Sequence, residues 1–471
     1  MPRNTHHAPF LTALGNYLEQ GVYPFHTPGH KGGRGALPKL RSVLARALAA
    51  DVSLMGELDD IHRPQGALLK AQRAAAALYG ADRTFFSVNG TTGALQALIL
   101  GSVLPGEKIV LPRDVHRSAI GALILSGARP VYVAPEFDTE FGIALPPPAA
   151  ALAAAFAGAG AVKALLLTSP NYYGLAADTR EAARIAHENG ALLLVDEAHG
   201  AHLGFHERLP ASALSLGADA SAQSTHKLLG ALTQSSLLHV KQGRLAIEPI
   251  AEAMSILTTT SPNQLLLASL DAACRQLAGA GRAMTEKAVK LADYMRAKLA
   301  ETDGLRLLSP PQGGARFFDP TKITVNVAGL GLTGFAAADF LRKRKIAVEL
   351  ADGANILFLI TYADKRAAVD AALRSLRELA RRKKAPRGIC GAPPLARKLV
   401  LTPREAFYGR RAHVPLSDAA GRVAAQDITF YPPGIPLVLP GELITKEIVE
   451  YARSQTAARR ENADPHVSVV C

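Results

Sequence analysis

The sequence is poor in cysteine and has no long apolar run. Its 471 residues include three cysteines, Cys274, Cys390 and Cys471, whose spacing matches neither paired disulfides nor a zinc site. This scarcity favours a reducing, cytoplasmic setting and predicts no bound metal. The first twenty residues hold only a short apolar stretch, too short for the core of a signal peptide. The longest uncharged apolar run, residues 149–162, falls short of the roughly 20 residues that span a bilayer, so we expect no membrane segment.

The composition is that of a folded globular protein with excess positive charge. Hydrophobic residues make up 48% and charged residues 20%, which excludes wholesale disorder. The net charge of +13 permits a nucleic-acid partner but does not require one. The basic run RRKKAPRG, residues 381–388, lacks the aromatic residues and motifs of nucleic-acid binding, so it is better explained as a solvated helix end. We therefore expect no nucleic-acid partner.

The order of apolar runs predicts an α/β fold. Short, continuously apolar runs alternate with helix-like stretches, a rhythm typical of a mostly parallel, doubly wound sheet covered by helices on both faces. The expected strands are residues 84–89, 108–112, 130–134, 162–168 and 191–199. In such a sheet, ligands bind at the carboxyl ends of the strands.

Changes of pattern along the chain predict several units. We expect an N-terminal segment over residues 1–35, a large domain over 36–305, a small α/β domain over 306–388 and a C-terminal domain over 389–471. The small domain is expected to hold two strands, KITVNV and ILFLITY, with a helix between them.

The run AQSTHKLLGALTQSS, residues 222–236, contains the main candidate for chemistry. Lys227 follows His226, and small hydroxyl residues surround both. A free lysine amine has a pKa of about 10.4, so burial or a Schiff base must keep it neutral if it is to react with a carbonyl. On its own, this pattern favours a surface lysine at a turn.

Asp196 changes that balance. It ends the apolar run LLLVD at the carboxyl edge of the predicted sheet, where an unpaired buried carboxylate is costly. A pyridinium nitrogen supplies a cationic partner, and a Schiff-base lysine with such an aspartate is typical of pyridoxal phosphate sites. The competing interpretation, an aspartate that caps a helix, explains the preceding apolar strand less well.

A third segment, SVNGTTG, predicts an anion site. Gly90, Thr91 and Thr92 stand where a helix follows a strand, so free backbone N–H groups and two hydroxyls converge there. His116 follows another predicted strand and would lie at the same edge, although a lone loop histidine is more often incidental.

The run at residues 222–236 resembles, position for position, the lysine signature of the fold type I ornithine/lysine/arginine decarboxylases. Other segments resemble that family in the same order along the chain: FHTPGHKGG, LDDIHRPQG, NGTTG, PNYYG, VDEAHGAHLGFH, YPPGIP and PGE. The resemblance implies a pyridoxal phosphate enzyme with a fold like that of aspartate aminotransferase. It further implies decarboxylation of a basic amino acid.

The resemblance also implies roles for individual residues. Lys227 would carry the cofactor as a Schiff base, Asp196 would bind the pyridine nitrogen, and His116 would stack on the ring. His199 would lie at the cofactor edge near the substrate, and either Lys227 or His226 would return a proton to Cα. The residues expected around the phosphate are Gly90, Thr91, Thr92, Ser224 and His226.

A cationic substrate end requires acidic partners. The candidates are Asp59 and Asp60 in GELDDIH, together with Glu57, and Glu442 in PGE; each is equally explained as a solvated surface acid. The layout lacks the N-terminal wing of the acid-stress members and resembles the biosynthetic arginine decarboxylases, which implies arginine as substrate and a place in polyamine biosynthesis. It further implies a dimer or dimer of dimers with shared sites, in which the stretch at residues 258–262 reaches the neighbouring subunit's phosphate.

Three alternatives remain open at this stage. Lysine or ornithine decarboxylation would use the same residues. Another fold type I reaction, such as that of an aminotransferase or an oxoamine synthase, would share Lys227 and Asp196, although no clear arginine clamp for a carboxylate is evident in the sequence. A binding protein that has lost activity is disfavoured by the intact set of lysine, aspartate and phosphate turn.

Overall fold

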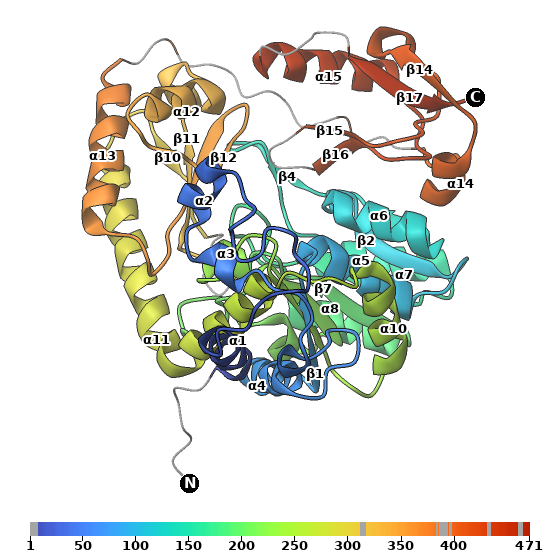
Figure 1. Cartoon of the computed structure of the whole chain (residues 1–471). Helices are drawn as coiled ribbons and strands as arrows, with labels where there is room; N and C mark the ends of the chain where they lie inside the picture. Colours follow the sequence, from blue (N-terminus) through green and yellow to red (C-terminus); the bar gives the residue numbers. More distant parts are fainter. Residues whose placement is uncertain are drawn as a thin grey trace.

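The computed structural model describes residues 8–310, 317–382, 385, 394, 398–430, 435–459 and 465–471. A large blue-to-green central unit is flanked by a smaller yellow-to-orange unit and by a red C-terminal unit (Figure 1). Three segments discussed above lie partly or wholly outside the described residues: most of the basic run at 381–388, Cys390, and the first four residues of YPPGIP.

A seven-stranded sheet forms the middle of the central unit. Its strands are β1 (Arg83–Ser87), β2 (Lys108–Pro112), β3 (Arg129–Val133), β6 (Ala164–Thr168), β7 (Leu192–Asp196), β8 (Ala220–Gln223) and β9 (Ser236–Val240). They lie in the order β1-β9-β8-β7-β6-β2-β3, and β9 runs antiparallel to both of its neighbours. The prediction of a mostly parallel sheet is confirmed. Because β9 is reversed, its first residue, Ser236, lies at the same edge as the carboxyl ends of the other strands.

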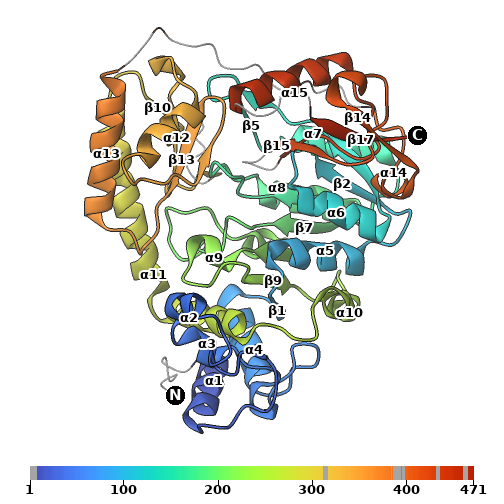
Figure 2. The same ribbon diagram turned by 45° about the horizontal axis from the view of Figure 1, so that its top comes forward.

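Helices cover both faces of this sheet, as Figure 2 shows. One face packs against α5 (Gly90–Ser102), α6 (Arg117–Ser126) and α10 (Ile247–Leu257), and the other against α7 (Ala149–Ala159) and α8 (Thr179–Glu188). Successive side chains of a strand point to opposite faces, so Leu166 of β6 joins the first core and Leu165 the second. Burial on both faces explains why the strands are continuously apolar.

A third helical layer links the N-terminus to the rest of the chain. The helices α1 (Pro9–Glu19), α4 (Ala67–Tyr79) and α11 (Gln264–Ala300) pack together, and the short helices α2 (Pro38–Leu44), α3 (Ala47–Ala50) and α9 (Thr225–Leu228) lie in the same unit. Asp271 of α11 accepts hydrogen bonds from the backbone N–H groups of Phe10 and Leu11, which satisfies the open end of α1. Of the helices described, none is both long and apolar enough to cross a membrane.

The smaller unit is built on a four-stranded antiparallel sheet. Its elements are β10 (Arg306–Leu307), β11 (Lys322–Asn326), β12 (Leu350–Ala351), β13 (Asn355–Leu359), α12 (Gly334–Arg342) and α13 (Arg366–Ala380). The end of α11 contributes Met295 and Leu299 to its core. A short hairpin of β4 (Phe137–Asp138) and β5 (Ile143–Ala144) reaches toward this sheet from the central unit, since Phe141 joins the same cluster as Leu350. The two predicted strands and the helix between them are confirmed.

The described residues of the C-terminal unit form two small two-stranded antiparallel sheets and two α-helices. These are α14 (Pro403–Tyr408), β14 (Arg411–Pro415), β15 (Ile428–Phe430), β16 (Ile435–Val438), α15 (Lys446–Arg459) and β17 (His466–Val470). The boundaries at residues 35, 305 and 388 stay a prediction.

A buried ion pair fastens this unit to the central sheet. Arg113, directly after β2, donates through Nε to Glu442 Oε1 at 2.7 Å and through Nη2 to Glu442 Oε2 at 2.5 Å. The same guanidinium donates to the carbonyl oxygens of Pro436 and Leu437. Both side chains are almost fully buried, at 7% and 0% exposure. The C-terminal unit therefore holds the loop that continues from Arg113 to His116.

Loss of one partner of this pair should destabilise the protein far more than loss of an exposed pair. Glu442→Gln leaves a buried guanidinium without its counter-charge, a change that typically costs about 3–5 kcal/mol. The control is Glu181→Gln, because Glu181 pairs with Arg184 on the surface, where such pairs contribute less than about 1 kcal/mol. Urea unfolding of both variants measures the difference.

The single variant Arg113→Met and the double variant Arg113→Met/Glu442→Gln complete a double-mutant cycle with Glu442→Gln. In the double variant no buried charge stays unpaired, so we expect its loss of stability to fall short of the sum of the two single losses by about 1 kcal/mol or more. Strictly additive losses would contradict ionic coupling across this contact.

Candidate active site

The carboxyl edge of the large sheet gathers most of the residues singled out in the sequence. Asp196 ends β7, and His116 caps α6 shortly after β2. Gly90 begins α5 after β1, and Lys227 lies in α9 directly after β8. Because these strands run in one direction, their following loops meet at one edge.

Asp196 is a buried carboxylate. It is 4% exposed, and its Oδ1 accepts the backbone N–H of Ala198 at 3.1 Å. Burial raises the pKa of Asp196, while His116 and Lys227 act in the opposite direction when they are protonated. A carboxylate placed in this way favours a cationic ligand group beside it.

His116 faces the same space from the start of α6. Its Nδ1 accepts the backbone N–H of Ser118, so the neutral ring carries its proton on Nε2. Burial lowers the pKa of His116, and Asp196 counters part of that effect. The ring is therefore held in one orientation as a neutral group.

The start of α5 forms a cluster of hydroxyls. Thr91 Oγ1 lies 2.6 Å from Ser224 Oγ and 2.7 Å from Ser236 Oγ. Gly90 has φ +63, a conformation that glycine adopts readily, and its N–H donates to Gln234 O. Thr92 is exposed. Backbone N–H groups of a helix start and several hydroxyls are the donors that a phosphate group accepts.

Lys227 is held by His199 and Tyr172. Its Nζ lies 2.7 Å from His199 Nε2 and 5.0 Å from the centre of the Tyr172 ring, which itself packs on His199 at 4.3 Å. Burial lowers the pKa of Lys227, and Asp196 partly restores it. His226 points elsewhere, since its Nδ1–H donates to Ser235 O, and burial lowers its pKa also.

One buried lysine near this site escaped the sequence analysis. Lys322, the first residue of β11, is fully buried, and its Nζ lies 2.9 Å from His199 Nδ1. Asp319, three residues earlier, is equally buried, and its Oδ2 lies 3.0 Å from His202 Nε2. The available signal was a lysine opening the apolar strand KITVNV, the same kind of charge at a strand end that drew attention to Asp196.

The acids suggested for the substrate's cationic end have other partners in this chain. Asp59 accepts the backbone N–H groups of Gln65, Gly66 and Leu68 and so caps the start of α4. Asp60 accepts the N–H of His62.

Glu442 also has a partner within the chain. Both of its oxygens bind Arg113. Among the described residues, neither it nor the two aspartates hydrogen-bonds to Lys227 or His199. The geometry gives all three acids a structural task, and their role toward a substrate stays a prediction.

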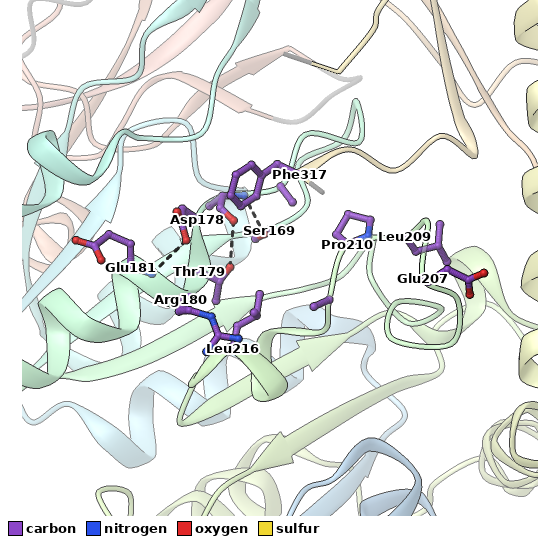
Figure 3. Close-up of a pocket in the computed structure, with 13 residues that line it drawn as sticks. Ser169, Asp178, Thr179, Arg180, Glu181, Glu207, Leu209, Pro210, Leu216 and Phe317 are labelled. Atoms are coloured by element: carbon purple, nitrogen blue, oxygen red, sulfur yellow. Dashed lines mark hydrogen bonds between the residues drawn. The ribbon is translucent and has the colours of Figure 1, made fainter. Parts of the chain in front are cut away.

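A separate pocket opens beside the start of α8. Its volume is about 410 Å³. Figure 3 shows Asp178, Thr179 and Glu181 on one side of it, with Pro210 and Phe317 nearby. None of the predicted cofactor residues lines this pocket.

Comparison with known proteins gives a consistent result. The family model of the Orn/Lys/Arg decarboxylase major domain matches residues 8–315, and that of the C-terminal domain matches residues 395–462. An arginine decarboxylase of Bacillus anthracis is 41% identical over 459 residues, which is 96% of this chain and 93% of that protein. An arginine decarboxylase of Bacillus subtilis is 40% identical over 458 residues, 95% of this chain and 93% of that protein.

Solved structures agree with the fold. The constitutive lysine decarboxylase of Escherichia coli superimposes with a TM-score of 0.83 at 24% identity, covering 99% of this chain and 82% of that one. A ureidoglycine-glyoxylate aminotransferase from Bacillus subtilis superimposes with a TM-score of 0.55 at 13% identity, covering 68% of this chain and 85% of that one. The expected fold type I architecture is confirmed. Since a family model matches more than half of the sequence and close relatives match nearly all of it, the chain belongs to the Orn/Lys/Arg decarboxylase family of enzymes.

Proposed function

We propose that this chain is a pyridoxal phosphate-dependent arginine decarboxylase that releases carbon dioxide and forms agmatine. The observation that carries the proposal is the meeting of a buried carboxylate, a lysine amine and a hydroxyl-lined helix start at one sheet edge. Arginine is favoured over lysine and ornithine because the relatives near 40% identity bear the name arginine decarboxylase. We also propose that the enzyme is cytoplasmic and acts in polyamine biosynthesis.

The donor set suits pyridoxal phosphate. Lys227 would hold the aldehyde, Asp196 would pair with the ring nitrogen, and His116 would contact the ring. The hydroxyl of Thr225, two residues before Lys227 in α9, is buried and has no hydrogen-bond partner among the described residues. This hydroxyl is therefore an unused donor close to Lys227. The phosphate group would take its contacts from Gly90, Thr91, Thr92, Ser224 and His226.

The chain's own residues then control bond breaking and proton return. When bound, pyridoxal phosphate accepts the electron pair that remains on Cα after the carboxylate leaves as carbon dioxide. Asp196 would hold the ring nitrogen as its cationic partner and so would favour the protonated ring. Lys227 would supply the proton that replaces the carboxylate on Cα, and His226 would do so only after turning away from Ser235 O. The buried setting of Asp196 excludes water from its partner and strengthens that pairing.

A homo-oligomer with shared sites is part of the proposal. The N-terminal segment exposes large apolar side chains, with Phe25 97% and Tyr23 82% exposed. Such a concentration of exposed apolar surface is typical of an interface. His62 of LDDIH contacts the stretch at residues 258–262, since its Nε2–H donates to Thr259 O and its Nδ1 accepts from Ser255 Oγ. This contact joins the two motifs, and we propose that both face a neighbouring subunit.

Carbon dioxide release tests the proposed reaction. We expect the protein with added pyridoxal phosphate to release carbon dioxide from arginine faster than from lysine or ornithine. Lys227→Ala should lose release from all three, because the variant lacks the amine that we propose to hold the aldehyde. If none of the three amino acids released carbon dioxide and a keto acid formed instead, the result would favour an aminotransferase.

The absorbance of the bound cofactor tests its attachment. The wild type should show a band near the visible edge that borohydride abolishes, and Lys227→Ala should lack it. Asp196→Asn should keep the band yet lose activity by about 10²-fold or more, because a neutral amide no longer stabilises the protonated ring. A wild type without such a band would refute the cofactor assignment.

Sedimentation tests the oligomer. Phe25→Ser should shift the protein toward the monomer and lower activity in proportion, because the site is shared between subunits. The matched control is Leu104→Ser, a change at an equally apolar residue that is 66% exposed elsewhere on the central unit. A fully active wild-type monomer at micromolar concentration would contradict shared sites.

A further inference from the structure

The proposed function leaves Lys322 without a role. This lysine belongs to the small antiparallel sheet, yet it is fully buried against the edge of the large one. Placing an ammonium group in the interior is costly unless it is paired or hydrogen-bonded. Its position therefore calls for a partner, and that partner is His199.

Lys322, His199 and Lys227 form a line of hydrogen bonds. Lys322 Nζ lies 2.9 Å from His199 Nδ1, and His199 Nε2 lies 2.7 Å from Lys227 Nζ. The histidine is 4% exposed, and Tyr172 packs against its ring. Both ring nitrogens are thus in contact with a lysine amine, one from each sheet unit.

The protonation states of His199 and Lys322 determine which atom donates in the hydrogen bond between them. Burial lowers the pKa of His199 well below 6.5, and the charge of Lys322 lowers it further, so the ring is neutral at pH 7. Burial lowers the pKa of Lys322 to about 8, and Asp319 acts against that shift, so Lys322 is still mostly charged at pH 7. An ammonium group can only donate. His199 Nδ1 must therefore accept, and the ring proton sits on Nε2.

We propose that Lys322 is a positioning residue that fixes His199 as the tautomer protonated at Nε2, so that His199 donates a hydrogen bond to the Lys227 amine. A donor can bind that amine only through its lone pair, which exists only in the neutral form. Lys322 thus acts through His199 to keep Lys227 ready to attack a carbonyl. The inference rests on the proposed function, because only that function requires a nucleophilic Lys227.

The surroundings keep Lys322 charged and in place. Asp319 is buried beside it, and His202, together with Lys322, holds the pKa of that carboxyl near 2, although burial alone would raise it. The charged and titratable groups that act on this line are Asp319, Glu349, His202, His116 and Asp196. Asp319 and Glu349 favour the charged form of Lys322, whereas the neighbouring Lys227 disfavours it.

The test is the pH dependence of Lys227 carbamylation by cyanate in the cofactor-free protein. Cyanate modifies neutral amines, so the rate at Lys227, followed by peptide mass mapping, gives the pKa of that amine. Lys322→Met removes the nearby cation and lets His199 accept from a charged Lys227. Both changes raise the pKa of Lys227, and we expect a rise of about one unit, or roughly tenfold slower modification near pH 7. Lys322→Arg keeps the charge and should restore most of the rate.

Matched controls separate positioning from folding. Thr324→Val changes a buried residue two positions along the same strand, whose hydroxyl makes no hydrogen bond among the described residues, and should leave the titration unchanged. Exposed Lys163 serves as the internal reference for cyanate reactivity in every sample.

The His199→Phe background decides whether Lys322 acts through the histidine. There, Lys322→Met should shift the pKa of Lys227 by much less than in the wild type. An equal shift in both backgrounds would mean that Lys322 acts by charge alone and would overturn the proposal. So would a Lys322→Met protein that melts at a lower temperature yet titrates like the wild type. Failure of the wild type to bind pyridoxal phosphate would refute the proposed function and leave this titration readable.

Discussion

The cost of burying charge governs how this chain is arranged. Asp196, Lys227 and Lys322 are ionisable groups withdrawn from water around one sheet edge, and each needs a partner there. Within the chain, His199 bridges the two lysines, and Asp196 faces His116 and Lys227. The phosphate and ring nitrogen of a bound cofactor would complete this set, so that the site is built around charges that the fold alone only partly compensates.

The same cost explains how the units hold together. Arg113 and Glu442 pair completely inside the protein, with further bonds from the guanidinium to two carbonyl groups, and they connect the C-terminal unit to the loop that carries His116. Lys322 connects the small sheet to His199 in a comparable way. The C-terminal unit is thus joined to the catalytic edge through a buried carboxylate, Glu442, and the small unit through a buried cation, Lys322.

Local sequence was enough to predict five strands of the seven-stranded sheet and the residues that follow them, but not β8 or the reversed β9. Asp196 and Thr91 are placed by strand ends, and a strand end is visible as an apolar run followed by a polar residue. Lys227 was found by its signature run. Partners far apart in sequence were beyond this reasoning: Arg113 meets Glu442 across 329 positions, and Lys322 meets His199 across 123. The same limit left Asp59 open as a substrate contact, because its capping bonds to α4 depend on how the loop folds back.

The most direct test of the account is a crystal structure of the protein after incubation with pyridoxal phosphate and reduction with borohydride. We predict density joining the cofactor to Lys227 Nζ, with the ring nitrogen on Asp196 and the phosphate at the start of α5. Attachment to Lys322, the other buried lysine at this edge, or a phosphate bound away from Thr91 and Ser224, would contradict it.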